Sequence, residues 1–355
     1  MSIIPIKIGT RSIGPGSPVF VIAEAGVNHN GRLDLAHQLI DAAKTAGADA
    51  VKFQTFTAER LNTRQAPKAT YHVRTTGSDE DQTWFELLKS QELSESAHRE
   101  LQQHCVESGI MFLSTPYDEE SADLLDRLNV DAIKVASTDS NNLPFLAHMA
   151  RLGRPMLYST GMCDMDEVRA GVATLRAAGC KDLVVMQCTS AYPVALHDLQ
   201  LRVIQTYAQE FGAPLGFSDH SDEPEPIAAL VALGLGMSVI EKHFTLDRNL
   251  PGPDHQASLI PEELTRVIAS LRKAELTLGD GRKRVLDCEQ ENRTKLRKSV
   301  VAAVDIPAGT RVTAAMLACR RPGFGLPPSA LDRIIGKTAT ESIAIDDLLT
   351  ESKVR

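Results

Sequence analysis

The chain has 355 residues, of which 43% are hydrophobic and 24% charged, a composition typical of a soluble globular protein with one large core and room for a small second domain. Its formal net charge of -8 argues against binding to nucleic acid or to an acidic membrane surface. No apolar run approaches the roughly 20 residues that span a bilayer, and residues 1–9 lack the layout of a secretory signal. An anionic ligand would therefore need a local basic pocket.

The six cysteines form no CxxC pair and no dense framework. This spacing is typical of reduced thiols in a cytoplasmic protein, and it argues against disulfides or a zinc ribbon.

A small hairpin or lid is expected over residues 7–16, and a regular alternation of strand-like and helical segments follows. The strand-like runs are 19–25, 50–56, 111–115, 132–136, 155–159, 183–188, 214–218 and 238–243. Helical patterns include 33–46, 94–108, 119–128, 143–152, 165–178, 225–233 and 262–278. Eight strand–helix units in about 250 residues predict an α/β fold of the (β/α)8 TIM-barrel type. An open doubly wound sheet is the alternative, but no Gly-rich dinucleotide turn follows the first strand.

The connection from Thr57 to Leu93 is too long for an ordinary loop, and it holds the only tryptophan, Trp84. It leaves the carboxyl end of the second strand, so it is either a wall or lid of a site or a solvated insertion. We assign the barrel domain to residues 1–280. A charged, Gly-punctuated linker is expected over 281–298, and a small β-rich domain over 299–355.

Charged side chains inside strands are the first sign of a site. Glu24 lies in an otherwise apolar strand, where an unpaired charge is costly. Lys52 and Lys134 lie in two further strands and need anionic partners, which are either a bound ligand or acids of neighbouring strands. A Schiff-base role for Lys134 is a further alternative. Asp254 follows the eighth strand and could reach the same mouth.

Hydroxyl and imidazole groups end the other strands. Two histidines, His220 and His243, follow neighbouring strands and could hold a divalent metal, or they could be ordinary buried histidines. The hydroxyls could donate to phosphate oxygens at a barrel mouth. They are Thr115, Ser137, Ser159, Ser190 and Ser218.

Together, these strand ends resemble those of the sialic acid synthases over nearly the whole chain. The segment Arg320-Arg321-Pro322-Gly323 is similar to part of the family's carboxyl-terminal antifreeze-like domain, the SAF domain of the β-clip type. The motifs that carry the resemblance are Ala23-Glu24-Ala25-Gly26-Val27-Asn28-His29-Asn30-Gly31, Val51-Lys52-Phe53-Gln54, Ser114-Thr115-Pro116, Ser159-Thr160-Gly161-Met162, Gly216-Phe217-Ser218-Asp219-His220, Glu241-Lys242-His243-Phe244 and Pro251-Gly252-Pro253-Asp254.

The resemblance implies condensation of phosphoenolpyruvate with an open-chain N-acyl hexosamine, giving a nine-carbon 2-keto acid and phosphate by C–O cleavage. The acceptor would be N-acetylmannosamine or 2,4-diacetamido-2,4,6-trideoxymannose, and the product sialic or legionaminic acid. It further implies that His220 and His243 hold Mn²⁺ or Mg²⁺, which polarises the sugar aldehyde.

The resemblance also assigns the substrate contacts. Lys52, Lys134, Thr115, Ser137, Ser159 and Ser218 would hold phosphoenolpyruvate, and Glu24, Gln54, Tyr192 and Asp254 would face the sugar. Arg321 would reach the N-acyl group from the partner subunit, which implies a domain-swapped homodimer.

One position departs from the family pattern. Ser190 stands where some members have Asn. A hydroxyl offers different hydrogen bonds from an amide, so Ser190 is the weaker assignment.

Two alternatives to this function remain open. Another phosphoenolpyruvate aldol-type synthase would act on phosphorylated aldoses and would need a second anion pocket. A noncatalytic sugar- or ice-binding protein would not need Glu24, Lys52, Lys134 or the two histidines.

Overall fold

The computed structural model describes residues 3–355, and the chain divides between Asp280 and Gly281 into two compact units. Each unit has a hydrophobic core of its own. The first unit contains every strand end discussed above, so the candidate site is a feature of that unit.

Eight parallel strands of the first unit close into a barrel in the order β10-β3-β4-β5-β6-β7-β8-β9. Pairing of β10 with β3 closes the ring, from Val239 opposite Phe20 to His243 opposite Glu24. The predicted (β/α)8 TIM barrel is therefore confirmed. The strands are β3 (Phe20–Gly26), β4 (Ala50–Thr55), β5 (Met111–Pro116), β6 (Ile133–Val135), β7 (Met156–Ser159), β8 (Leu183–Cys188), β9 (Leu215–Asp219) and β10 (Val239–His243).

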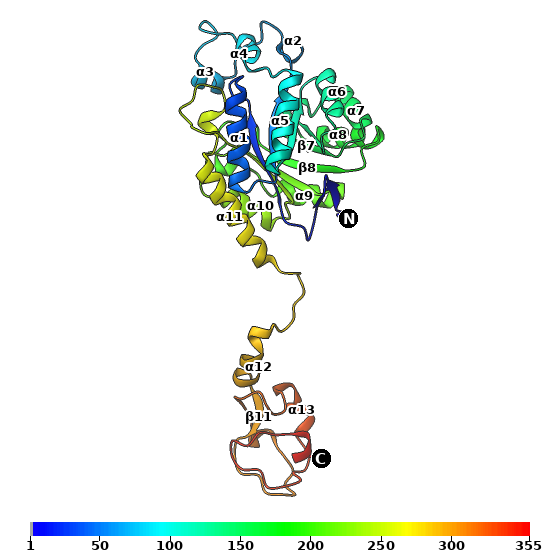
Figure 1. Cartoon of the computed structure of the whole chain (residues 1–355). Coiled ribbons are helices and arrows are strands. Elements are labelled where there is room, and N and C mark those ends of the chain that lie inside the picture. The colour runs from blue at the N-terminus through cyan, green and yellow to red at the C-terminus, as the bar shows by residue number, and fades with distance from the viewer. Residues whose placement is uncertain (1–2) are drawn as a thin grey trace. The chain divides into compact units, whose positions relative to one another are not determined.

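Amphipathic helices cover the outside of the barrel, and α1 and α5 run side by side on it (Figure 1). In α1 the buried residues Ala36, Leu39, Ile40 and Ala43 recur at helical spacing, and Gly47 ends the helix in the left-handed conformation with φ 88°. The surrounding helices are α1 (Leu33–Ala46), α5 (Glu95–Ser108), α6 (Glu119–Arg127), α7 (Leu143–Arg151), α8 (Met165–Ala177), α9 (Val203–Phe211), α10 (Ile227–Gly234) and α11 (Pro261–Leu278).

A hairpin of β1 (Ile6–Ile8) and β2 (Arg11–Ile13) precedes the barrel. Of the two structures expected for this segment, a hairpin or a lid, the structure shows the hairpin. Its buried Ile6, Ile8 and Ile13 share one apolar cluster with residues from the beginnings of the strands, such as Phe20 and Val239. The hairpin therefore plugs the amino end of the barrel interior, and the opposite, carboxyl end is left for chemistry.

The long connection after β4 contains α2 (Ala58–Leu61), α3 (Thr70–Thr76) and α4 (Trp84–Gln91), which gather at one end of the barrel (Figure 1). We call residues 57–93 the lid segment. Phe85 and Leu88 of α4 pack with Val27 and Phe56 from the loops that follow β3 and β4. The lid segment is therefore a packed structure attached to the carboxyl ends of these strands.

The second unit is small and built around an antiparallel pair, β11 (Ser299–Ala302) and β12 (Leu317–Arg320). Isolated bridges such as Ile306 with Ile343 extend the pairing. The predicted SAF fold of this part is confirmed. Its helical elements are α12 (Gln290–Leu296), which lies in the segment expected as a linker, and α13 (Leu331–Ile334).

None of the helices within residues 3–355 combines the length and the hydropathy that a membrane span requires.

Candidate active site

Strand alternation decides which side chains reach the barrel interior. Alternate residues of a strand face opposite sides, and the interior cluster takes Ile22 from β3, Ala50 from β4 and Val239 from β10. The next inward positions are two residues further along each strand. They are Glu24, Lys52 and Glu241, which form a charged layer above the apolar plug.

Lys52 is the centre of this layer. Its Nζ lies 2.7 Å from Glu24 Oε2 and 3.7 Å from Glu241 Oε1, and it donates a 2.8 Å hydrogen bond to Thr115 Oγ1. All four side chains are buried. The structure thus brings together three predicted site residues and one residue, Glu241, to which the sequence had given no role.

Glu241 pairs with both strand lysines, because Lys134 Nζ lies 3.5 Å from its Oε2. Ser218 Oγ donates to the same carboxylate at 3.3 Å. Burial would raise the pKa of Glu241, but Lys134 and Lys52 hold it at about 2. The signal that could have found Glu241 is alternation, since it lies between inward-facing Val239 and His243.

Glu24 has the opposite electrostatic balance. Burial raises the pKa of its carboxyl to about 7, although Lys52 opposes the shift. Gln54 Nε2 lies 3.4 Å from Glu24 Oε1 and donates to it. A carboxyl that titrates near neutral pH can both donate and accept a proton.

Burial lowers the pKa of Lys134, although the charge of Glu241 opposes the shift. Lys52 is buried as well, but Glu24 and Glu241 raise its pKa. The two lysines therefore differ, and Lys52 is the more firmly held cation.

The predicted metal ligands lie next to each other, with His220 and His243 ring centroids 5.4 Å apart. His220 Nδ1 donates to the Thr189 carbonyl at 3.0 Å, which leaves Nε2 to face the mouth. His243 Nδ1 is buried, makes no hydrogen bond and lies 4.0 Å from Asp254 Oδ2. Burial and the charge of His220 keep the pKa of His243 well below its usual value, so its ring is neutral.

Imidazole nitrogens are common ligands of divalent metals, so these two rings would supply part of the coordination shell of a metal bound here. Among residues 3–355, no group of three or more His, Cys, Asp or Glu side chains is arranged to hold a metal. The remaining positions would fall to substrate and water.

Two of the predicted hydroxyls, Ser137 and Ser190, lie around Gly161. Ser159 Oγ is buried without a hydrogen-bond partner, and Ser137 Oγ accepts from the Gly161 amide at 3.0 Å. A Cβ on Gly161 would lie 2.2 Å from Ser190 Oγ and 2.7 Å from Ser137 Oγ. Only glycine fits there, so the chain can bring these hydroxyls and a backbone amide together.

Aromatic rings line the same mouth. Tyr192 stacks on His220 with ring centroids 4.3 Å apart, and its OH lies 3.4 Å from His220 Nε2. Tyr71 of the lid segment also stacks on Tyr192, with ring centroids 5.0 Å apart. Burial raises the pKa of nearby Asp254 to about 6. This contact between Tyr71 and Tyr192 supports the alternative in which residues 57–93 form a wall or lid of the site.

Arg321 belongs to the second unit, where it directly follows β12 and is exposed. Its reach toward a sugar remains a prediction.

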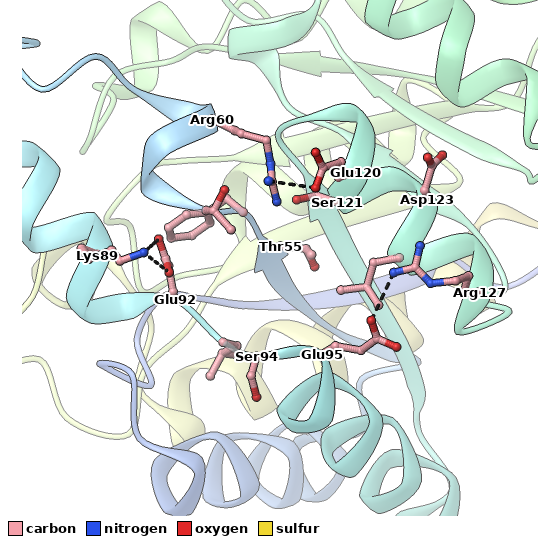
Figure 2. Close-up of a pocket in the computed structure, with 14 residues that line it drawn as sticks. Thr55, Arg60, Lys89, Glu92, Ser94, Glu95, Glu120, Ser121, Asp123 and Arg127 are labelled. Carbon is pink, nitrogen blue, oxygen red and sulfur yellow. Dashed lines mark hydrogen bonds and ion pairs between the residues drawn. The ribbon is translucent and has the colours of Figure 1, made fainter.

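A different cavity, of about 580 Å³, lies outside the barrel mouth, between the lid segment, the beginning of α5 and one face of α6. Figure 2 shows its charged side chains paired with one another. The pairs are Arg60 with Glu120, Lys89 with Glu92, and Arg127 with Glu95. The cavity shares no lining residue with the predicted site, and its charges are already satisfied.

Comparisons with known proteins agree with this architecture. The NeuB family model matches residues 39–283, and the SAF domain model matches residues 297–355. The N,N'-diacetyllegionaminic acid synthase of Legionella pneumophila is 42% identical over 340 residues, covering 95% of this chain and 94% of that protein. The N-acetylneuraminate-9-phosphate synthase of Homo sapiens is 39% identical over 346 residues, covering 97% and 95%.

A solved structure shows the same fold. The N-acetylneuraminic acid synthetase of Leptospira borgpetersenii, crystallised with citrate, superposes with a TM-score of 0.72 at 32% identity, covering 81% of this chain and 95% of that chain.

Proposed function

The chain belongs to the NeuB family, and on that basis we propose that it condenses phosphoenolpyruvate with an open-chain N-acyl hexosamine. The products are a nine-carbon 2-keto sugar acid, of the sialic or legionaminic type, and phosphate released by C–O cleavage. The observation that carries the proposal is the charged layer inside the barrel mouth. Two buried lysines face two buried carboxylates there, beside two histidine rings whose centroids lie 5.4 Å apart.

Phosphoenolpyruvate carries a carboxylate and a phosphate, and both need cations in a buried site. Lys52 and Lys134 supply the charge. Thr115 already accepts a hydrogen bond from Lys52, while the Ser159 hydroxyl is buried and has no hydrogen-bond partner. We propose that these groups, with Ser137 and Ser218, hold the anion so that its methylene carbon faces the acceptor.

Glu24 and Asp254 would face the acceptor sugar, and Glu24 would act on it as a proton donor. When the methylene carbon bonds to the aldehyde carbon, the aldehyde oxygen becomes a hydroxyl and takes a proton. A carboxyl whose pKa is about 7 can donate that proton at neutral pH, which fits Glu24. Water then adds to C2 and loses a proton, and the C2–O bond to phosphate breaks to leave the ketone. Gln54 and Tyr192 would orient the sugar's hydroxyls.

His220 and His243 would hold the divalent metal, Mn²⁺ or Mg²⁺. A metal bound there would polarise the aldehyde oxygen of the open-chain sugar. His220 suits this role because its Nδ1–H is fixed on the Thr189 carbonyl, and this bond orients the ring.

We further propose that the working unit is a domain-swapped homodimer in the cytoplasm, where phosphoenolpyruvate is available. Arg321 of one chain would contact the acceptor bound in the other chain's barrel. A planar guanidinium suits this role because it can donate more than one hydrogen bond to an N-acyl oxygen.

The test is phosphate release from phosphoenolpyruvate with Mn²⁺, comparing N-acetylmannosamine with 2,4-diacetamido-2,4,6-trideoxymannose. Release that requires one of these acceptors is expected. With ¹⁸O in the bridging C2–O position of phosphoenolpyruvate, C–O cleavage puts the label in the phosphate. Release with neither acceptor from folded, metal-loaded protein, or label retained in the sugar acid, would contradict the proposal.

A further inference from the structure

A chain of ring contacts connects the lid segment to the site. Trp84 stacks on His72 at 4.0 Å, and His72 contacts Tyr71 at 3.9 Å. Tyr71 stacks on Tyr192 at 5.0 Å, and Tyr192 stacks on His220. Tyr71 thus connects the lid segment to Tyr192 and, through it, to His220.

The helix that carries Tyr71 is fixed from both ends. Lys68 is buried, and its Nζ donates to the carbonyls of Thr76, Gly77 and Ser78 at 3.0 to 3.5 Å, where α3 ends. Trp84 belongs to α4, which packs on the loops after β3 and β4. Because these contacts hold α3 in place, the position of the Tyr71 ring is set by the fold.

The surface that Tyr71 presents is uncharged or negative. Burial lowers the pKa of His72 to about 4, so His72 is neutral at pH 7. Burial and the Asp254 carboxylate raise the pKa of the Tyr71 hydroxyl, so it stays protonated. The Lys68 ammonium is engaged by backbone carbonyls. A phosphoryl dianion placed here would lose water and meet a carboxylate instead of a cation.

We propose that Tyr71 is a specificity-determining residue that, with Tyr192, forms the apolar wall for the far end of the acceptor. This inference rests on the proposed condensation and narrows its substrate class to unphosphorylated N-acyl hexosamines with an apolar or neutral C6 group. Stacking of sugar C–H groups on an aromatic face gains from the ring's apolar area, whereas a C6 phosphate gains nothing from it.

Arg74 offers the alternative to this inference, in which the acceptor is phosphorylated. It is exposed, lies on α3 one turn after Tyr71, and could meet a phosphate at the edge of the mouth. If the chain used a phosphorylated acceptor, Arg74 would be a lid cation placed to bind it.

The experiment measures kcat and KM of the full-length, Mn²⁺-loaded protein for N-acetylmannosamine and for N-acetylmannosamine 6-phosphate, with phosphoenolpyruvate saturating. The proteins are wild type, Tyr71→Phe, Tyr71→Ala and Arg74→Ala. Thermal unfolding of each variant tests the fold. Trp84, the only tryptophan, reports by its fluorescence whether the lid segment keeps its packing.

Wild type should prefer the unphosphorylated sugar by roughly 100-fold or more in kcat/KM, the discrimination expected where a charge is desolvated without a partner. Tyr71→Phe should keep this ratio. Tyr71→Ala should raise KM for the neutral sugar roughly 10-fold, leave KM for phosphoenolpyruvate unchanged, and reduce the preference. Arg74→Ala should resemble wild type.

A wild-type preference for the 6-phosphate that Arg74→Ala removes would overturn the inference. So would a folded Tyr71→Ala with an unchanged acceptor KM and preference. In both cases phosphate release would still support the proposed function. Absence of release from wild type with either sugar, and with 2,4-diacetamido-2,4,6-trideoxymannose, would instead overturn the function and the inference with it.

Discussion

Glu24 and Glu241 are both buried in the same barrel mouth, yet their pKa values move in opposite directions. Burial raises both, but Glu241 lies between Lys134 and Lys52, whereas Glu24 pairs mainly with Lys52 and is also repelled by Glu241. Environments that push the pKa values of two carboxyls apart in this way leave one carboxyl as an acid–base group and the other as a fixed anion. Glu241 is then the counterion that keeps two buried lysines charged.

Replacing Glu241 with Gln should therefore destabilise the protein, because Lys134 loses the anion 3.5 Å away. Breaking a buried pair typically costs about 3–5 kcal/mol. Phosphoenolpyruvate brings negative charge back, so it should raise the melting temperature of Glu241→Gln more than that of wild type. Differential scanning fluorimetry with and without the ligand measures both effects. An unchanged melting temperature in the absence of ligand, or equal shifts with it, would count against this role of Glu241.

The metal assignment makes a separate prediction. His220→Ala and His243→Ala should each weaken Mn²⁺ binding by roughly 100-fold or more, since each removes a nitrogen ligand. Isothermal titration calorimetry measures the affinity directly, independent of turnover. His104→Ala is the matched control, because His104 of α5 pairs with Asp41 of α1 outside the barrel and its replacement should leave binding unchanged. Wild-type affinity in either mouth variant would rule out that histidine as a ligand.

At the scale of elements, strand order and inward positions could be predicted from the sequence, because buried parallel strands are continuous apolar runs with period-2 facing. Glu24, Lys52 and Lys134 stood out as charges inside such runs. Glu241 did not, because its strand continues as Glu241-Lys242-His243 and the polar run hides the alternation. The structure separates them: Lys242 pairs with Asp219 at 2.9 Å, while Glu241 joins the inward layer.

Two further features, the range of helix α9 and the packing of the lid segment, could not be predicted from the local sequence pattern. The eight predicted strand–helix units imply a helix where α9 lies, but its range was not assigned from the sequence. Its Val203, Ile204, Tyr207 and Phe211 are β-branched or aromatic residues that also suit strands. The lid segment's packing depends on contacts between Tyr71 and Tyr192, which are far apart in sequence. No periodicity carries that information.

The hairpin before the barrel gives a test at this scale. Ile8→Ala should cost about 2–5 kcal/mol in the free energy of unfolding, because Ile8 is fully buried in the plug and its removal leaves a cavity. Lys7→Ala, on the exposed face of the same strand, should cost little. Urea unfolding compares the two. The KM values of folded Ile8→Ala should match wild type, since the plug closes the end opposite the site. Equal stability of both variants would contradict the plugging role.

At the scale of the whole molecule, the proposed role of the second unit is to bring Arg321 to an acceptor bound in a barrel mouth. The two lysines of the described mouth are paired with carboxylates, and we propose that Arg321 adds a hydrogen-bond donor for the N-acyl oxygen of the acceptor. Arg321→Ala should raise the acceptor KM roughly 10- to 100-fold, the loss of about 1.5–3 kcal/mol for a hydrogen bond from a charged group. The KM for phosphoenolpyruvate should stay unchanged, and equal effects on both substrates would contradict the assignment.

Subunit mixing decides whether Arg321 acts within one chain or across two. Co-expressed His220→Ala and Arg321→Ala chains are each defective, but a swapped heterodimer has one intact site, made of the Arg321→Ala chain's barrel and the other chain's second unit. At acceptor concentrations below KM, random pairing should restore about one quarter of wild-type activity, because about half of the dimers are mixed and each has one intact site of two. If Arg321 acted on its own barrel, no mixed dimer would have an intact site. Pairing Arg321→Ala with a chain carrying both changes removes the intact second unit, so this control should stay inactive.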